Sequence, residues 1–197
     1  GNYIATVYNN LDGYMYLNGS ANWSPGGVLI FSLAKVDTPV FVGQYQQDYA
    51  HDSYVHGNRL YAAAIYGGGG INIADITNKA NPTHITDINY TGSGTHNVWT
   101  TTNGNVAIST DEIGSTAKNL KFWNVQNIPP APSSPIATYS VSPTDIVHNV
   151  FVRGNYAFVA WYTAGIAVVN IANPSSPSTA GFYDTSIEPS GGYDGVC

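Results

Sequence analysis

Apolar residues return at the same offsets at four places along the chain. The copy that starts at Gly70 has apolar residues one, three and six positions later, at Ile71, Ile73 and Ile76. The other copies start at Gly27, Asn119 and Gly165. An apolar residue at every second position indicates a β-strand with one buried face. In three copies a proline follows six positions after the last apolar residue and marks a turn, because proline cannot donate to a strand ladder.

Three further strands accompany each repeated strand, so each copy predicts a unit of four strands, A to D, in which the repeated strand is C. Strand A is expected at 4–8, 53–56, 98–101 and 150–152, and strand B at 14–17, 60–65, 106–109 and 156–161. Strand D is expected at 40–45, 84–90, 136–141 and 179–183. Turns such as Gly57-Asn58 between strands A and B favour hairpins, so each unit is predicted to be an antiparallel meander.

Four-stranded units that repeat every 40 to 50 residues or so are typical of β-propeller blades. We therefore predict an all-β protein with four visible blades at 1–49, 50–94, 95–145 and 146–185. Residues 186–197 are expected to be a tail or the start of a further strand, so that the chain forms part of a larger propeller. A β-sandwich is the alternative, but it does not require the same strand C spacing four times.

Composition narrows the range of partners. Charged residues make up 9% of the chain, against about 25% in an average soluble domain. The net charge is −6 and only six residues are Lys or Arg, so a nucleic-acid partner is not expected. No apolar run is long enough to predict a membrane span. The single cysteine, Cys197, excludes an intrachain disulfide and a cysteine zinc site.

Three segments carry a resemblance to a known family: HNVWTTTNGNVAISTDE, VHNVFVRGNYAFVAWYTAGIAVVNIANP and GFYDT followed by GGYDG. They resemble the LVIVD-repeat propellers, including the choice-of-anchor B group of secreted bacterial proteins. The resemblance implies a propeller in an exported or cell-surface protein and implies little about its chemistry. Such relatives continue into another blade after the YDG-type segment, so one expected partner is the missing remainder of the same protein.

Three histidines occupy equivalent positions just before strand A, each followed by an acid or an amide. In a propeller strand A is innermost, so these side chains are expected to converge near the axis, on the face that also carries the loops between strands B and C. The expected ligand or partner face comprises His51, Asp52, His96, Asn97, His148, Asn149, Trp23 and Tyr162. The expected metal ligands are His51, His96, His148, Asp111 and Glu112.

Imidazole and carboxylate ligands together favour a zinc-like divalent cation, whereas calcium prefers oxygen ligands alone. Binding to such a site should weaken as the pH falls through the usual imidazole pKa of about 6.5. The alternative is structural: each histidine hydrogen-bonds a backbone carbonyl of the neighbouring blade, and the following acid or amide caps the turn.

Two functions follow from these expectations. The favoured one is a non-enzymatic extracellular binding or scaffold module that presents its loop face to a protein, a glycan or a matrix component. The alternative is a metal-dependent hydrolase with a histidine and acid site at the axial mouth. No G-x-S-x-G motif is present and no catalytic residue is assigned.

Overall fold

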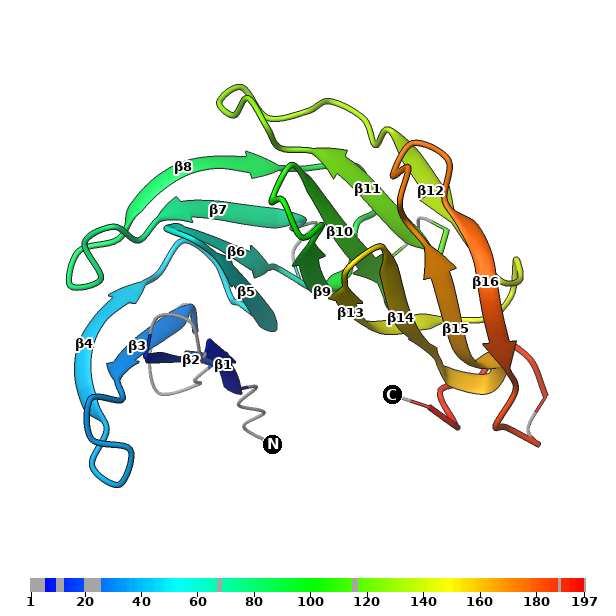
Figure 1. The fold of residues 1–197 in the computed structure, drawn as a ribbon, viewed down its shortest axis with the longest axis horizontal. Coiled ribbons are helices and arrows are strands. Elements are labelled where there is room, and N and C mark those ends of the chain that lie inside the picture. Colours follow the sequence, from blue (N-terminus) through cyan, green and yellow to red (C-terminus); the bar gives the residue numbers. More distant parts are fainter. Residues whose placement is uncertain are drawn as a thin grey trace.

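The computed structural model describes residues 6–9, 13–19, 26–66, 69–114, 117–187 and 189–196. Four antiparallel sheets of four strands stand side by side in an open arc, with blade 1 and blade 4 at its two ends (Figure 1). Apart from a short 3-10 turn at Tyr162–Ala164, the regular elements described are all strands. The predicted all-β propeller of four-stranded blades is confirmed.

Chain order is also spatial order within each blade, as a meander requires. Blade 1 contains β1 (Thr6–Asn9), β2 (Tyr14–Asn18), β3 (Val28–Ser32) and β4 (Val40–Tyr45). Blade 2 contains β5 (Asp52–His56), β6 (Arg59–Ala63), β7 (Ile71–Asp75) and β8 (Thr83–Ile88). Blade 3 contains β9 (Thr95–Thr100), β10 (Val106–Asp111), β11 (Leu120–Asn124) and β12 (Ala137–Tyr139). Blade 4 contains β13 (Val147–Arg153), β14 (Tyr156–Trp161), β15 (Gly165–Asn170) and β16 (Ser178–Tyr183).

The apolar core lies between neighbouring blades, because each blade turns alternate residues of its strands toward the blade on either side. Ile71 and Ile73 of blade 2 pack with Val98 and Ala107 of blade 3, and all four are fully buried. Similar clusters join blade 1 to blade 2 and blade 3 to blade 4. The apolar positions that repeat in strand C are therefore positions in the core between blades.

The glycine that opens strand C in three blades has a steric cause. A Cβ atom at Gly27, Gly70 or Gly165 would collide with a backbone carbonyl oxygen at the end of strand D of the same blade. The colliding oxygens belong to Tyr45, Ile88 and Tyr183. Strand C can lie this close to the end of strand D only where no side chain intervenes.

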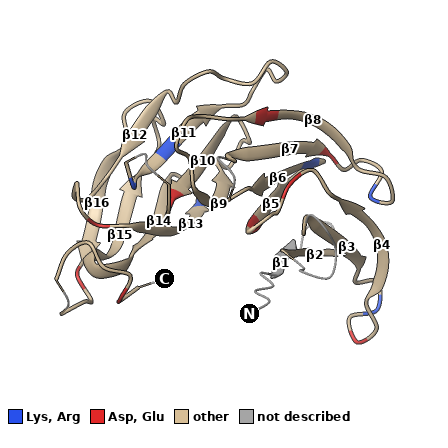
Figure 2. Cartoon of the chain, turned by 180° about the vertical axis from the view of Figure 1, so that it is seen from behind, with Lys and Arg blue, Asp and Glu red and all other residues tan. Residues whose placement is uncertain are grey.

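Charged side chains are sparse and spread over the molecule (Figure 2). Among the described residues no helix is long and apolar enough to cross a membrane.

Candidate metal centre

Two β-bulges direct histidines toward the propeller axis. In blade 3, Thr95 pairs with Asp111 and Asn97 with Thr110, which leaves His96 as an extra residue in β9. In blade 4 the pairing also shifts around His148, in β13. A bulge bends the strand and re-aims its side chain. His96 and His148 thus lie within their strands, not before them as the sequence predicted, whereas His51 directly precedes β5.

The three imidazoles form a continuous row across blades 2, 3 and 4, called here the histidine row. Ring centroids lie 4.4 Å apart for His51 and His96 and 3.9 Å apart for His96 and His148. The Nδ1 atom of each ring is buried and has no hydrogen-bond partner among the described residues. Hydrogen bonds from these histidines to a neighbouring backbone carbonyl, which the structural alternative requires, are therefore not made through Nδ1. A hydrogen bond between His96 and the backbone of His148 in the next blade does oppose the lowering of the His96 pKa, so this part of the structural alternative stands for His96.

The residues that follow the histidines also join neighbouring blades. Asp52 accepts hydrogen bonds from the side-chain amides of Asn18 in blade 1 (3.4 Å) and Asn97 in blade 3 (2.6 Å). The Asn97 Oδ1 atom in turn accepts a hydrogen bond from the backbone N–H of Val150 in blade 4 (3.0 Å). This polar chain crosses all four blades, so Asp52 and Asn97 hold the blades in register beside the histidine row rather than forming its ligand face.

Glu112 brings a carboxylate to the histidine row. Its Oε2 atom lies 3.7 Å from His96 Nε2, and its Oε1 atom lies 4.0 Å from His148 Nε2. The hydroxyl group of Tyr162 donates a hydrogen bond to Oε1 at 2.5 Å. His51, His96 and Glu112 each offer one ligand atom, and these atoms lie within 4.8 Å of one another. Two imidazoles and a carboxylate at this spacing can close onto one divalent cation with bonds of about 2.0 to 2.2 Å after a small side-chain adjustment.

Asp111, expected beside Glu112 in the metal site, lies elsewhere. Consecutive residues at a strand end point to opposite faces, and the Asp111 side chain is fully buried on the other face. It forms an ion pair with Lys121 (2.5 Å) and accepts a hydrogen bond from the Tyr90 hydroxyl group (2.7 Å). Asp111 therefore anchors the end of β10, the strand that presents Glu112.

Burial lowers the pKa of all three imidazoles. The pKa of His96 falls to about 2, through burial first and then through repulsion from His148 and His51. Burial also lowers the pKa of His51 and of His148, and in both cases the nearby Glu112 carboxylate opposes the shift. The rings are therefore neutral at neutral pH, as metal ligation requires. Competition between protons and a cation should begin below the pH of about 6.5 expected from the sequence.

The remaining candidates divide into two groups. Tyr162 lies beside the histidine row, with its ring centroid 4.8 Å from that of His148, whereas Asn149 is half-buried in β13 and Trp23 falls outside the described residues. Sequence reasoning missed Tyr49, whose ring centroid lies 6.4 Å from that of His51. Its position two residues before His51 was the available signal. Tyr66 and Tyr193, which extend the same line of rings, were missed as well.

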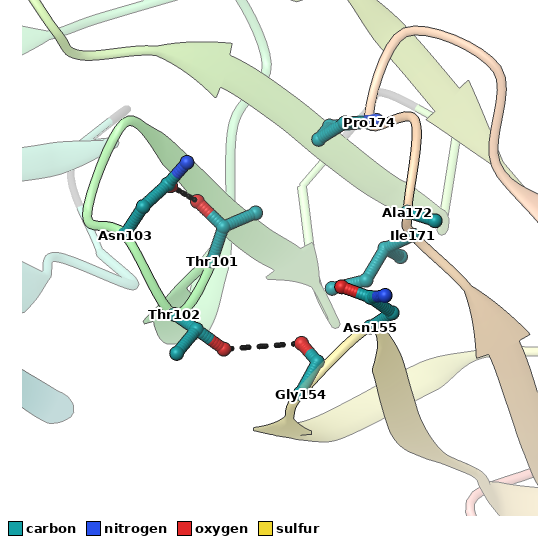
Figure 3. Close-up of a pocket in the computed structure, with 8 residues that line it drawn as sticks. All are labelled: Thr101, Thr102, Asn103, Gly154, Asn155, Ile171, Ala172 and Pro174. Atoms are coloured by element: carbon teal, nitrogen blue, oxygen red, sulfur yellow. Dashed lines mark hydrogen bonds between the residues drawn. The ribbon is translucent and has the colours of Figure 1, made fainter.

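A hollow of about 310 Å³ lies at the opposite end of the strands, between turns of blades 3 and 4 (Figure 3). Thr102 donates a hydrogen bond to the carbonyl oxygen of Gly154 across it (3.0 Å). Its lining residues are Thr101, Thr102, Asn103, Gly154, Asn155, Ile171, Ala172 and Pro174. None of these side chains is ionisable, so the hollow offers no acid, base or metal ligand. The candidate ligands lie at the axial mouth instead.

Comparison with known proteins supports the propeller fold. The LVIVD repeat matches residues 146–185, which contain blade 4. No curated protein sequence matches the chain. One similar solved structure is described as a putative 6-phosphogluconolactonase from Bacteroides uniformis, with a TM-score of 0.73 and 10% identity over 92% of this chain and 57% of that one.

Two further structures extend the comparison. One, described in the same words, comes from Bacteroides fragilis, with a TM-score of 0.70 and 13% identity over 91% of this chain and 56% of that one. The other is the periplasmic gluconolactonase of Pseudomonas aeruginosa, with a TM-score of 0.64 and 13% identity over 94% of this chain and 57% of that one. The chain thus spans somewhat more than half the length of these proteins.

These comparisons correct the favoured functional expectation. The sequence favoured a non-enzymatic binding or scaffold module, yet the propellers that the chain resembles include two described as putative 6-phosphogluconolactonases and one described as a gluconolactonase.

Proposed function

We propose that this protein is a metal-dependent hydrolase of ester-type bonds, including those of lactones, which are cyclic esters. The observation that carries the proposal is the convergence of His51, His96 and Glu112 at the axial mouth, with buried imidazole nitrogens that have no partner in the described part of the chain. The putative 6-phosphogluconolactonase and the gluconolactonase among the structural neighbours support the choice of bond.

The donor set suits a first-row divalent cation held by the imidazoles of His51 and His96 and the carboxylate of Glu112. When bound, such a cation lowers the pKa of a water ligand and polarises a carbonyl oxygen. The Tyr162 hydroxyl group fixes one carboxylate oxygen, so that Glu112 presents its other oxygen toward His96. This hydrogen bond keeps the carboxylate in one orientation, as an ordered ligand requires.

His148 has the position and protonation state of a general base. Its Nε2 atom lies 4.0 Å from Glu112, and burial keeps its pKa low enough for the ring to be neutral at neutral pH. A neutral imidazole can accept a proton from the attacking water and return it to the oxygen of the departing alcohol. The net reaction consumes one water and yields a carboxylic acid and an alcohol.

The test combines metal analysis with turnover. We expect purified protein to bind about one divalent cation, and chelation to abolish hydrolysis of a sugar lactone and of an activated ester until zinc or manganese is restored. Glu112→Gln should lower kcat about 100-fold or more, in the range for loss of a key electrostatic group. Asp37→Asn, at an exposed turn of blade 1, is the matched control and should have no effect. Absence of both bound metal and turnover would refute the proposal.

We also infer that the protein is an exported bacterial protein of the choice-of-anchor B group. The LVIVD match to blade 4 and the periplasmic location of one structural neighbour support this inference. Fractionation of the source cells tests it, since the protein should appear outside the cytoplasmic fraction.

A further inference from the structure

Aromatic rings continue the histidine row on both sides. Beyond His51 lie Tyr49 and then Tyr66, with 5.3 Å between the two tyrosine ring centroids. Beyond His148 lie Tyr162 and then Tyr193, with 5.4 Å between their centroids. The histidine row and these four tyrosines form one unbroken line of rings along the mouth, called here the aromatic arc.

The two ends of the aromatic arc differ from its middle. His96, at the centre, is 6% exposed, whereas Tyr66 and Tyr193, at the ends, are 61% and 55% exposed. The central rings pack against one another at tilted angles, but the end tyrosines keep ring surface in contact with water. An exposed aromatic ring on each side of the candidate metal ligands can stack on a ligand that extends past those ligands in both directions.

Charge limits what that ligand can be. Aromatic rings in a line also bind single-stranded nucleic acid, but such sites combine stacking with a positively charged groove. Here the six Lys and Arg residues are distributed over all four blades rather than gathered in a groove. Among the described residues the Glu112 carboxylate lies against the histidine row, and Lys118 is close enough for its charge to interact with that of Glu112. Sugar rings pair an apolar face, which stacks on tyrosine, with hydroxyl groups that remain in water, so an uncharged glycan fits this surface.

We propose that the substrate is an ester-substituted, otherwise uncharged glycan chain that lies along the aromatic arc, with sugar units on both sides of the reacting bond. This inference rests on the proposed function for the ester cleavage, in which water adds to the acyl group and the sugar hydroxyl leaves. The sugar units stack on Tyr66 at one end and on Tyr193 at the other. The enzyme therefore acts at internal positions of the chain.

Calorimetric titration with xylo- and cello-oligosaccharides of one to six units tests the binding. Affinity should rise with chain length. Tyr66→Ala and Tyr193→Ala should each lower the ratio of hexamer to monomer affinity about three- to tenfold, the usual worth of one aromatic contact. Tyr156→Ala is the matched control: this tyrosine is 44% exposed at the start of β14, away from the mouth, and its loss should change nothing. Absence of binding in both series, or a ratio unaffected by either tyrosine variant, would overturn the proposal.

A second measurement separates this proposal from the hydrolase proposal. Glu112→Gln should lose the release of acetate from acetylated xylo-oligosaccharides while still binding the unsubstituted oligosaccharides. If affinity rises with oligosaccharide length but no divalent cation supports turnover, the hydrolase proposal is refuted and the glycan-binding surface is retained. If lactones and small esters are hydrolysed but no oligosaccharide binds, the glycan-substrate proposal is refuted and the hydrolase proposal is retained.

Discussion

One buried imidazole, that of His96, and two half-buried ones, those of His51 and His148, make the stability of this protein depend on pH. The folded-state pKa of His96, about 2, lies below the unfolded value of about 6.5, so the unfolded chain binds more protons between these values. Protonation of His96 therefore does not reduce the free energy of unfolding above about pH 6.5. Below that pH the free energy of unfolding decreases, by at most about 1.4 kcal/mol per pH unit for this residue. Urea unfolding between pH 8 and pH 4.5, with chelator present, measures the slope. His96→Asn should flatten it, and an unchanged slope in that variant would contradict the assignment.

The buried ion pair of Asp111 and Lys121 gives a second prediction for single residues. Lys121→Met leaves a fully buried carboxylate without its cation, although the Tyr90 hydroxyl group still donates to it. We expect a loss of about 3 kcal/mol in the free energy of unfolding. Asp111→Asn added to Lys121→Met removes the uncompensated charge and should recover much of this loss. Equal stability of the single and double variants, measured by urea unfolding, would show that the charge carries no cost.

Within one blade, the approach of strand C to the end of strand D determines which residue can open strand C. Gly70→Ala places a Cβ atom against the carbonyl oxygen of Ile88, so β7 and β8 must separate locally. We expect a loss of about 3 kcal/mol, as for other overpacked sites. Gly181→Ala in β16 is the control, because its Cβ atom would meet only the Val168 side chain at 3.8 Å. Thermal unfolding compares the two, and equal melting temperatures would refute the steric explanation.

At the scale of the whole molecule, blade 4 carries an uncovered apolar face. Val28, Ile71 and Leu120, at the first apolar position of strand C, are fully buried by the next blade, whereas Ile166 at the same position in blade 4 is 40% exposed. Phe158, which pairs across the sheet with Phe151, is 41% exposed on the same face. An apolar surface of this kind favours association.

We therefore expect residues 1–197, produced by themselves, to self-associate through the face of blade 4. Sedimentation velocity at increasing protein concentration should detect assemblies, and Phe158→Ser should shift them toward monomer. Ile187→Ser is the control, since Ile187 is 98% exposed after the last strand and outside this face. A monomer at every concentration would contradict the expectation.

The sequence by itself determined the blades, because alternating apolar positions and hairpin turns are local signals that every copy repeats, and a glycine opens strand C in three of the four copies. It also placed the three histidines and Glu112 at one mouth, since equivalent positions in a repeat lie on the same face. Only the tertiary structure decided which groups meet there. The register of β9 against β10 makes His96 a bulge, and the pleat turns Asp111 away from Glu112. The packing of three blades brings together imidazoles that lie about 50 residues apart in the sequence. These outcomes depend on pairing between distant strands, which a local pattern does not contain.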